Sequence, residues 1–539
     1  MEKGYIASTS GIKAREKIGY AMGKRSPLRQ TLPPLLCLAA FFVLFAFVNF
    51  VYLPRFIDGD IYADMQLARE IWRQKTFFPS NWIYGNQYYT VATPVLAALF
   101  FGLTGSMNLS MSLATTCMSA LLVWSFLWML RPFEGRPALR LSALLLFVAC
   151  PMANDLLREP QGQLFFTLAS YYACYLITLC LVFGDYARAI LQPEQGFRPL
   201  PFLLSLALSF LTGMQSLRQT LIMVLPLLAL EALRLLLRRS SRAGLLRALA
   251  YALANLLGLG LIKLLRIPAR TIYGQVELGG GALGDRLLAD WHAVRGITGL
   301  DTALFDPPKA FFLLFFALTV LLVPAAALLL WKRRKERSGL ALLWLLCAVS
   351  LFGTLLAGLI VQIRMREIYL FLWYLLVALS LLPLLDALGD RGKTLSIALL
   401  CLLSLANLIF SYGSSLSLAR ERDPAPALAF CRDAEAAGIE YVYGDWSNVP
   451  GLLVWSDGKI TGGFWDEIIF LVRDTINLQD IYTEDCNDKA LYVLGIWGRG
   501  NFDRYCHEMG GEYEVFGEYG DWIAYKTDKQ LMNFGAKAP

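Results

Sequence analysis

The sequence predicts a mainly α-helical bundle that crosses a membrane about eleven times, with outer juxtamembrane helices and a small C-terminal α/β domain. Of the 539 residues, 57% are hydrophobic and only 17% are charged, and the mean hydropathy is +0.50. Apolar runs of about 20 residues, the length that spans a bilayer, recur along most of the chain. We therefore expect a cytoplasmic tail at 1–31, a transmembrane region at 32–413 and an extracytoplasmic domain at 414–539.

The N-terminal segment is polar and basic, and no small-residue cleavage pattern follows the first apolar run. We interpret that run as an uncleaved first span and not as a removed signal peptide. The formal net charge of +7 is explained by lysines and arginines on the cytoplasmic face of a membrane. No basic stripe interleaved with aromatic residues occurs in a soluble segment, so nucleic acid is not expected as a partner.

The distribution of basic residues predicts the orientation. The run from Tyr88 to Gly102 is short, and we expect it to lie partly embedded on the outer side. With that choice, the N-terminus and every arginine-rich loop become cytoplasmic, as the positive-inside rule favours. The chain is then a multi-pass protein of the plasma membrane with its C-terminal domain outside. The eleven expected spans lie near 32–53, 108–130, 141–154, 164–184, 199–213, 219–237, 245–265, 310–331, 339–361, 368–387 and 394–413.

The segment after residue 413 has the pattern of a small α/β domain. Asp423 can cap a helix that Pro424 opens and Gly438 closes. Strands are expected at 439–443, 491–494 and 522–525, and Asp457-Gly458 is typical of a tight turn. Three of the ten cysteines, Cys431, Cys486 and Cys506, fall here. A disulfide between Cys486 and Cys506 is one arrangement that this odd set allows.

The first outer loop, 54–90, carries an acidic cluster, Asp58-Gly-Asp-Ile-Tyr-Ala-Asp64. If the chain is helical after Gly59, Asp60 and Asp64 lie one turn apart on the same face, and Asp58 stands at the helix start. Such carboxylates could hold a divalent cation or act as a general base toward a hydroxyl. The alternative is a solvated amphipathic helix. The aromatic residues Trp82 and Tyr84, followed by the embedded half-helix, favour a pocket at the interface.

The pattern Asp58-x-Asp60-x-x-x-Asp64, then Asn81-Trp82-x-Tyr84, then Pro94 opening a half-helix resembles the start of the GT-C membrane glycosyltransferases. These include protein mannosyltransferases, aminoarabinose transferases and bacterial relatives. The resemblance implies a sugar donor on a polyprenyl phosphate, and an outer-loop acid, matched here by Asp58, that acts on the acceptor. Transferases of the aminoarabinose type carry Lys-Pro-Pro before the half-helix, where this chain has Ala92-Thr93-Pro94.

Positive charge for a lipid phosphate is therefore expected from other outer segments. Arg158 and Glu159 lie in the second outer loop, and Arg218 lies in a very short link between two spans. Arg364 and Arg366 precede Tyr369, an arrangement that resembles the Arg/Tyr site found late in GT-C membrane domains. A guanidinium suits a phosphate because it offers a rigid fork of donors and stays charged. The alternative is snorkelling to lipid headgroups.

Three functions stay open at this point. The leading hypothesis is an inverting glycosyltransferase of the cell envelope that moves a sugar from a polyprenyl-phosphate donor to a glycan, lipid or protein acceptor outside. Asp58 and Asp60 are its catalytic candidates. The substrate-binding candidates are Asp64, Trp82, Tyr84, Arg158, Glu159, Arg218, Arg364, Arg366 and Tyr369. The second hypothesis is a transporter or flippase of a lipid-linked or small polar solute, and the third is a non-catalytic scaffold of GT-C shape.

Overall fold

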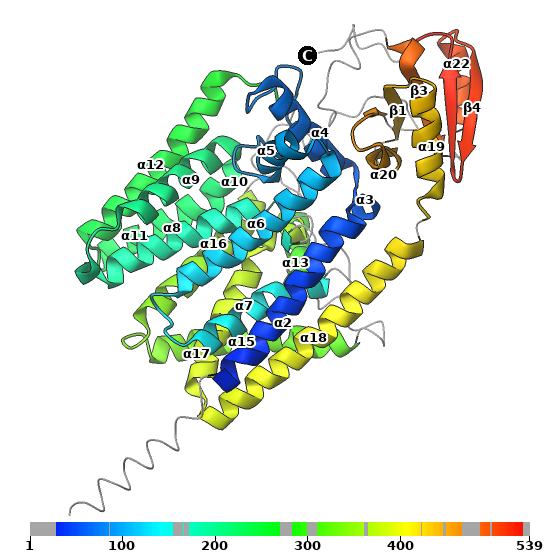
Figure 1. Cartoon of the computed structure of the whole chain (residues 1–539). Coiled ribbons are helices and arrows are strands. Elements are labelled where there is room, and N and C mark those ends of the chain that lie inside the picture. Colours follow the sequence, from blue (N-terminus) through cyan, green and yellow to red (C-terminus); the bar gives the residue numbers. More distant parts are fainter. Residues whose placement is uncertain are drawn as a thin grey trace, which may run out of the picture.

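We describe the protein from a computed structural model, which covers residues 28–85, 87–154, 165–166, 172–269, 283–298, 310–360, 365–421, 423–445, 449–465, 486–495 and 499–531. Within these ranges the chain forms a helical bundle followed by a small sheet domain (Figure 1). The fold class predicted from the sequence is confirmed. Arg158, Glu159 and Arg364 lie outside the described residues.

Each expected span corresponds to a helix. Eight of these helices are long and apolar enough to cross a membrane within the described part of the chain. The remaining three, α7, α9 and α15, are shorter or less fully described, so the number eleven stays a prediction. The helices are α2 (Leu28–Phe47), α6 (Met107–Leu130), α7 (Pro137–Asn154), α8 (Ala173–Leu191), α9 (Pro199–Gln215), α10 to α11 (Leu217–Leu236, with a π-helical turn at Thr220–Val224), α12 (Arg242–Leu265), α15 (Ala310–Lys332), α16 (Ser338–Ile360), α17 (Leu372–Ala387) and α18 (Asp390–Glu421).

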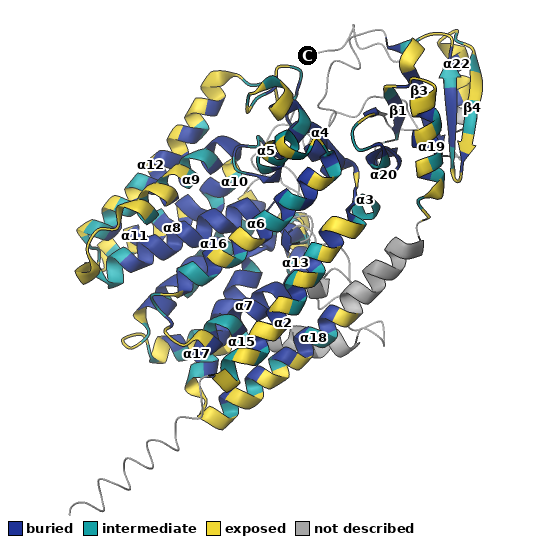
Figure 2. Ribbon diagram, in the orientation of Figure 1, coloured by how far each residue is buried: buried dark blue, intermediate teal, exposed yellow. Residues whose placement is uncertain are grey.

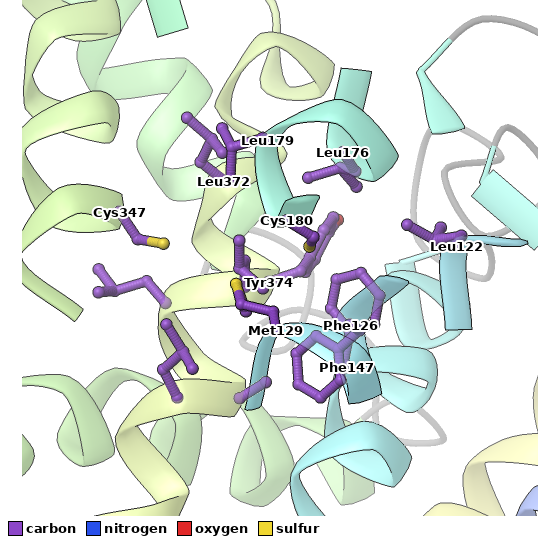
Figure 3. Packing of buried hydrophobic residues seen from close by; sticks show 14 of the residues in the cluster. Leu122, Phe126, Met129, Phe147, Leu176, Leu179, Cys180, Cys347, Leu372 and Tyr374 are labelled. Atoms are coloured by element: carbon purple, nitrogen blue, oxygen red, sulfur yellow. The ribbon is translucent and has the colours of Figure 1, made fainter. Parts of the chain in front are cut away.

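Helix α8 lies at the centre of the bundle. All its residues from Ala173 to Arg188 are buried, and α17 is almost as enclosed, whereas α2, α12 and α18 expose apolar faces (Figure 2). Figure 3 shows the packing around α8, where side chains of α6, α7, α16 and α17 meet. The rings of Phe126 and Phe147 stack there with their centroids 4.9 Å apart. Because α8 is packed on all sides, it holds Tyr172 and Tyr175 at its start and Arg188 near its end in fixed positions.

The basic loops gather at one end of the bundle. Arg136 contacts the carboxylate of Asp386 at 2.8 Å, and Arg337 contacts both Asp386 and Glu134. Near the start of α2, Gln30 donates a hydrogen bond to Thr394 at the start of α18. The ends of α2, α6, α16, α17 and α18 therefore share one side, as the positive-inside argument requires.

The other end carries three short helices and the C-terminal domain (Figure 1). The short helices are α3 (Leu53–Phe56), α4 (Gly59–Gln74) and α5 (Thr93–Thr104), and α5 is the expected half-helix. In the C-terminal domain, a five-stranded mixed sheet has the order β2-β1-β3-β5-β4, and α19 (Ala425–Ala436), α20 (Val449–Leu453) and α22 (Arg499–Glu508) accompany it. Its strands are β1 (Tyr441–Asp445), β2 (Thr461–Trp465), β3 (Ala490–Gly495), β4 (Tyr513–Tyr519) and β5 (Trp522–Thr527).

The structure contains the helix cap and the helix end that the sequence predicts for the C-terminal domain, but not the disulfide. Asp423 accepts a hydrogen bond from the Ala425 N–H at 2.9 Å, and Gly438 follows the helix with a φ of +72°. The disulfide considered between Cys486 and Cys506 is not formed. All ten cysteines lie in the described part of the chain and none is in a disulfide. Cys506 is instead enclosed in the hydrophobic core of the domain, where a thiol packs as a small apolar group.

Candidate functional site

Asp58 begins helix α4 as its N-cap residue. Its backbone is extended, and its Oδ1 accepts a hydrogen bond from the Ile61 N–H at 2.9 Å. The helix then continues through Asp60 and Asp64, one turn apart, as the sequence predicts. An N-cap aspartate is a common structural feature, so its cap role alone does not indicate chemistry.

The electrostatic environment of Asp58 differs from that of an ordinary cap. Withdrawal from water by the surrounding protein raises the pKa of Asp58 to about 6, and the nearby charge of Asp60 adds to the effect. The hydrogen bond from Ile61 opposes the rise. Part of the side chain remains exposed to solvent. A carboxylate with a pKa near 6 that a substrate can reach is suited to accept a proton at neutral pH.

Asp60 and Asp64 face the phenol of Tyr89, which lies in the segment before α5. Burial, followed by the charge of Asp64 and that of Asp60, raises the pKa of Tyr89 well above its usual value. Asp64 is 2% exposed, while Asp60 is open to solvent. The predicted acidic face of α4 therefore contacts a tyrosine of the outer loop, and the solvated-helix alternative does not describe Asp64.

The segment from Tyr84 to Val91 is tied to the ends of two long helices. The Tyr88 N–H bonds the Gln215 carbonyl at 2.9 Å, and the Gln215 side chain accepts from the Val91 N–H at 3.3 Å. The Tyr84 N–H bonds the Pro268 carbonyl, just after α12, at 2.9 Å. These bonds hold the loop that carries Gln87 and Tyr89 against the bundle.

Gln87 joins this loop to an aromatic cage around Arg218. The Tyr175 hydroxyl donates a hydrogen bond to Gln87 Oε1 at 3.0 Å, and both residues are buried. The Arg218 guanidinium carbon lies 4.9, 5.5 and 5.3 Å from the ring centroids of Tyr172, Tyr175 and Tyr369. A continuous line of polar side chains therefore runs from the acids of α4 to Arg218.

Arg218 is partly buried and has no carboxylate within 4 Å among the residues that the structure describes. The tyrosine rings stabilise its charge through their π faces, but they do not neutralise it. A guanidinium in such a setting is prepared for an anion, because buried charges are normally paired. The π-helical turn at Thr220–Val224 directly follows it, and such turns are frequent at functional sites.

The other predicted residues separate into two groups. Tyr369 belongs to the cage, and Arg366 precedes the same 3-10 turn, Glu367–Leu370, with its side chain exposed. Trp82 and Tyr84 are 1% and 0% exposed and belong to the hydrophobic core shared by α4, α5 and the C-terminal domain. Their side chains pack the loop against its surroundings, and their role as substrate-binding residues stays a prediction.

Sequence reasoning missed Gln87, Tyr172 and Tyr175 as site residues, and Tyr89 entered it only within the apolar run that begins at Tyr88. The available signal was the clustering of tyrosines at 171–172 and 175 at the start of an apolar run. Tyrosines are enriched at membrane interfaces, where one end of the side chain is apolar and the other is wet. Their convergence on Arg218 depends on how α8 and α10 pack.

A cavity of about 340 Å³ lies beside helix α13 (Leu283–Ile297) and is lined by Asp285, Leu288, Ala289, His292 and Met365. Nearby, burial raises the pKa of Asp290, whose Oδ1 has no hydrogen-bond partner among the described residues. Met365 lies two residues before the Glu367–Leu370 turn that carries Tyr369, so the cavity and the tyrosine cage share one segment of the chain.

Asp58 and Asp60 are the two acids at the start of α4 that the sequence offers for a divalent cation. Within the described ranges, no three histidine, cysteine, aspartate or glutamate side chains come together in a way that could hold a metal ion. A divalent cation at Asp58 and Asp60 stays a prediction, and we derive no step through it.

Comparison with known proteins shows the fold. No protein-family model and no curated protein matches the sequence. Two solved structures of the aminoarabinose transferase ArnT from Cupriavidus metallidurans are similar. The one bound to undecaprenyl phosphate has a TM-score of 0.52 at 14% identity, and the apo one has a TM-score of 0.53 at 13% identity. Each match covers 92% of this chain and 98% of the other. The chain thus has the GT-C fold expected from its first outer loop.

Proposed function

We propose that this multi-pass membrane protein, which has the GT-C fold, is a glycosyltransferase. It would move a sugar from a polyprenyl-phosphate donor to an acceptor hydroxyl outside the cytoplasm. The similar ArnT structure is bound to undecaprenyl phosphate, which supports a lipid phosphate as the donor carrier. A membrane presents such a donor laterally, so the protein needs no domain for a soluble nucleotide sugar.

The observation that carries this proposal is the Arg218 cage. Three tyrosine rings surround a guanidinium that has no acidic partner among the described residues. A phosphate is the group whose shape and charge match the guanidinium fork. When the bond between the sugar and the lipid phosphate breaks, negative charge develops on the phosphate oxygen. Arg218 would stabilise that charge, which is the most effective use of a fixed cation in catalysis.

Asp58 would supply the base. Its carboxylate takes the proton of the acceptor hydroxyl while that oxygen forms a bond to the anomeric carbon, and the electron pair of the breaking bond leaves with the lipid phosphate. Attack from the face opposite the leaving group inverts the anomeric centre. Asp60, Asp64 and Tyr89 would orient the acceptor between the base and the cage. Arg366, exposed beside the cage, and Arg158, Glu159 and Arg364 remain candidates for binding substrate.

The decisive experiment is a transfer assay with the full-length protein and a radiolabelled polyprenyl-phosphate sugar. Asp58→Asn is the informative variant, because asparagine caps a helix as well as aspartate but cannot act as a base. We expect the transfer rate to fall by about 10²–10⁴-fold, the usual contribution of a general base. Glu514→Gln, an exposed change on strand β4, serves as the matched control and should leave the rate unchanged. Equal rates for Asp58→Asn and wild type would remove Asp58 from its role.

The rival hypotheses give different results in the same assay. A transporter or flippase would carry the labelled lipid across vesicles without moving label to any acceptor. A scaffold would bind the lipid phosphate, through Arg218, with neither transfer nor transport. Label in the acceptor that depends on Asp58 supports the transferase alone.

A further inference from the structure

A second basic pocket lies at the end of the bundle opposite the acidic loop. It is formed by the end of α8, the 3-10 turn Pro193–Gln195 with the residues after it, and the start of α12. Its volume is about 160 Å³, and its lining residues include Asp185, Arg188, Phe197, Arg198 and Arg247. None of these residues belongs to the proposed transferase site, although Tyr172 and Tyr175 lie at the other end of α8.

Positive charge exceeds negative charge in this pocket. Three guanidinium groups line it, whereas Asp185 is its one lining carboxylate. Asp185 already accepts from Arg247 at 2.8 Å and from the Tyr251 hydroxyl at 2.5 Å. Arg131 and Arg198 both lie close enough to Arg188 to repel its charge. Asp185 also attracts Arg188, but its bonds go to Arg247 and Tyr251. Neither Arg188 nor Arg198 forms an ion pair with a carboxylate in the described part of the chain.

Arg188 is the centre of this excess. Arg188 is only 7% exposed. Its guanidinium carbon lies 4.4 Å from the centroid of the Trp128 ring, over the face of that ring. Its Nε has no hydrogen-bond partner within the described residues. A buried guanidinium nitrogen without a hydrogen-bond partner is unfavourable, so an anion that enters the pocket and pairs with Arg188 would stabilise the fold.

The surroundings of the pocket are those of a bilayer interface. Phe197, which lines the pocket, is 62% exposed, and Leu200 on α9 and Leu246 on α12 are 76% and 65% exposed. Apolar side chains exposed on spanning helices face lipid tails. The pocket therefore opens where a lipid places its headgroup, with acyl chains alongside α9 and α12.

We propose that this pocket binds the phosphate of an anionic phospholipid headgroup, with Arg188 and Arg198 as its principal ligands. Basic pockets between spanning helices on the cytoplasmic side are suited to such headgroups. The lipid would join α8, α9 and α12 at their ends. This site takes a structural lipid and is separate from the donor site at Arg218.

Thermal unfolding of the delipidated full-length protein in neutral detergent tests the proposal. Phosphatidylglycerol or cardiolipin should raise the Tm of the wild type at concentrations where phosphatidylcholine does not. Arg188→Gln and, separately, the exposed Arg198→Gln should each weaken the apparent affinity about fivefold or more, as expected for one arginine at an anionic lipid. Arg198→Gln keeps the test valid if Arg188→Gln does not fold.

The double variant Arg238→Gln/Arg239→Gln is the control, because it removes charge from an exposed loop at the same end of the bundle. It should retain the wild-type response to lipid. Equal weakening in this control would mean that anionic lipid binds the basic face without using the pocket. A full stabilisation by inorganic phosphate alone would make a soluble anion the ligand, and no response to anionic lipid would overturn the site altogether.

Discussion

At the residue scale, the acid that begins α4 has two properties that can be separated by experiment. Its Oδ1 caps the helix, and withdrawal from water raises its pKa to about 6. A base must be ionised to accept a proton, so transfer should rise about tenfold per pH unit below pH 6 and level off above it. A pH–rate profile measures this. Asp58→Asn should lose the acidic limb and keep the residual rate constant across the range.

The Arg218 cage leads to a second prediction at this scale. Arg218→Gln removes the cation that would stabilise the departing phosphate, and we expect kcat to fall by about 10²–10³-fold. Arg218→Lys should recover part of the rate, because a lysine keeps the charge but loses the fork of donors. Arg266→Gln, an exposed change just after α12, is the control. Loss of activity in that control as well would point to general surface charge.

At the element scale, two glycines let α9 and α12 approach each other closely. A Cβ atom at Gly213 would lie 2.1 Å from the Asn255 carbonyl oxygen, and one at Gly258 would lie 2.0 Å from that of Phe210. Small residues at such contacts allow the backbones of membrane helices to touch. The contact positions Gln215 and Arg218, because Gln215 is the last residue of α9 and Arg218 lies three residues further on.

Gly213→Ala should therefore destabilise the bundle by about 1–3 kcal/mol, the usual cost of overpacking. Gly260→Ala on α12 is the matched control, since a Cβ there meets nothing within 4 Å. It should leave stability unchanged or raise it by about 0.5–1 kcal/mol, because alanine favours helix over glycine. Unfolding in a denaturant series within one detergent compares the two variants, and equal stabilities would contradict the close contact.

At the scale of the whole molecule, the C-terminal domain is docked on α4. Arg69 donates hydrogen bonds to the Gly458 carbonyl at 2.9 Å and to Thr461 at 3.1 Å. The Asn108 N–H, at the start of α6, adds a bond to Asp457 at 2.8 Å. Asp60 and Asp64 lie on the same helix as Arg69, so the docked domain helps to hold the acids of the proposed site in place.

Arg69→Ala should loosen this docking. A hydrogen bond to a charged group contributes about 1.5–3 kcal/mol, so amide exchange in the turn at 457–462 should quicken by about tenfold or more. Arg432→Ala removes an exposed arginine of α19 that forms an ion pair with its neighbour Asp433 and lies away from the turn. Exchange in the turn should be unchanged in that variant. If both variants exchange alike, Arg69 does not hold the domain.

Four features of the protein could be predicted from its amino-acid sequence: the membrane bundle, the shared side of the basic loops, the cap at Asp58 and the α/β character of the C-terminal domain. Each of these follows from local pattern, because hydropathy, capping and charge asymmetry act within a few turns of the chain. Three other features became visible only in the folded protein. Gln87, Tyr172 and Tyr175 gather around Arg218, Trp82 and Tyr84 lie in the hydrophobic core, and Arg188 lines a second pocket. Such contacts depend on how α8, α9 and α12 pack, and that packing balances many weak interactions between segments far apart in the chain.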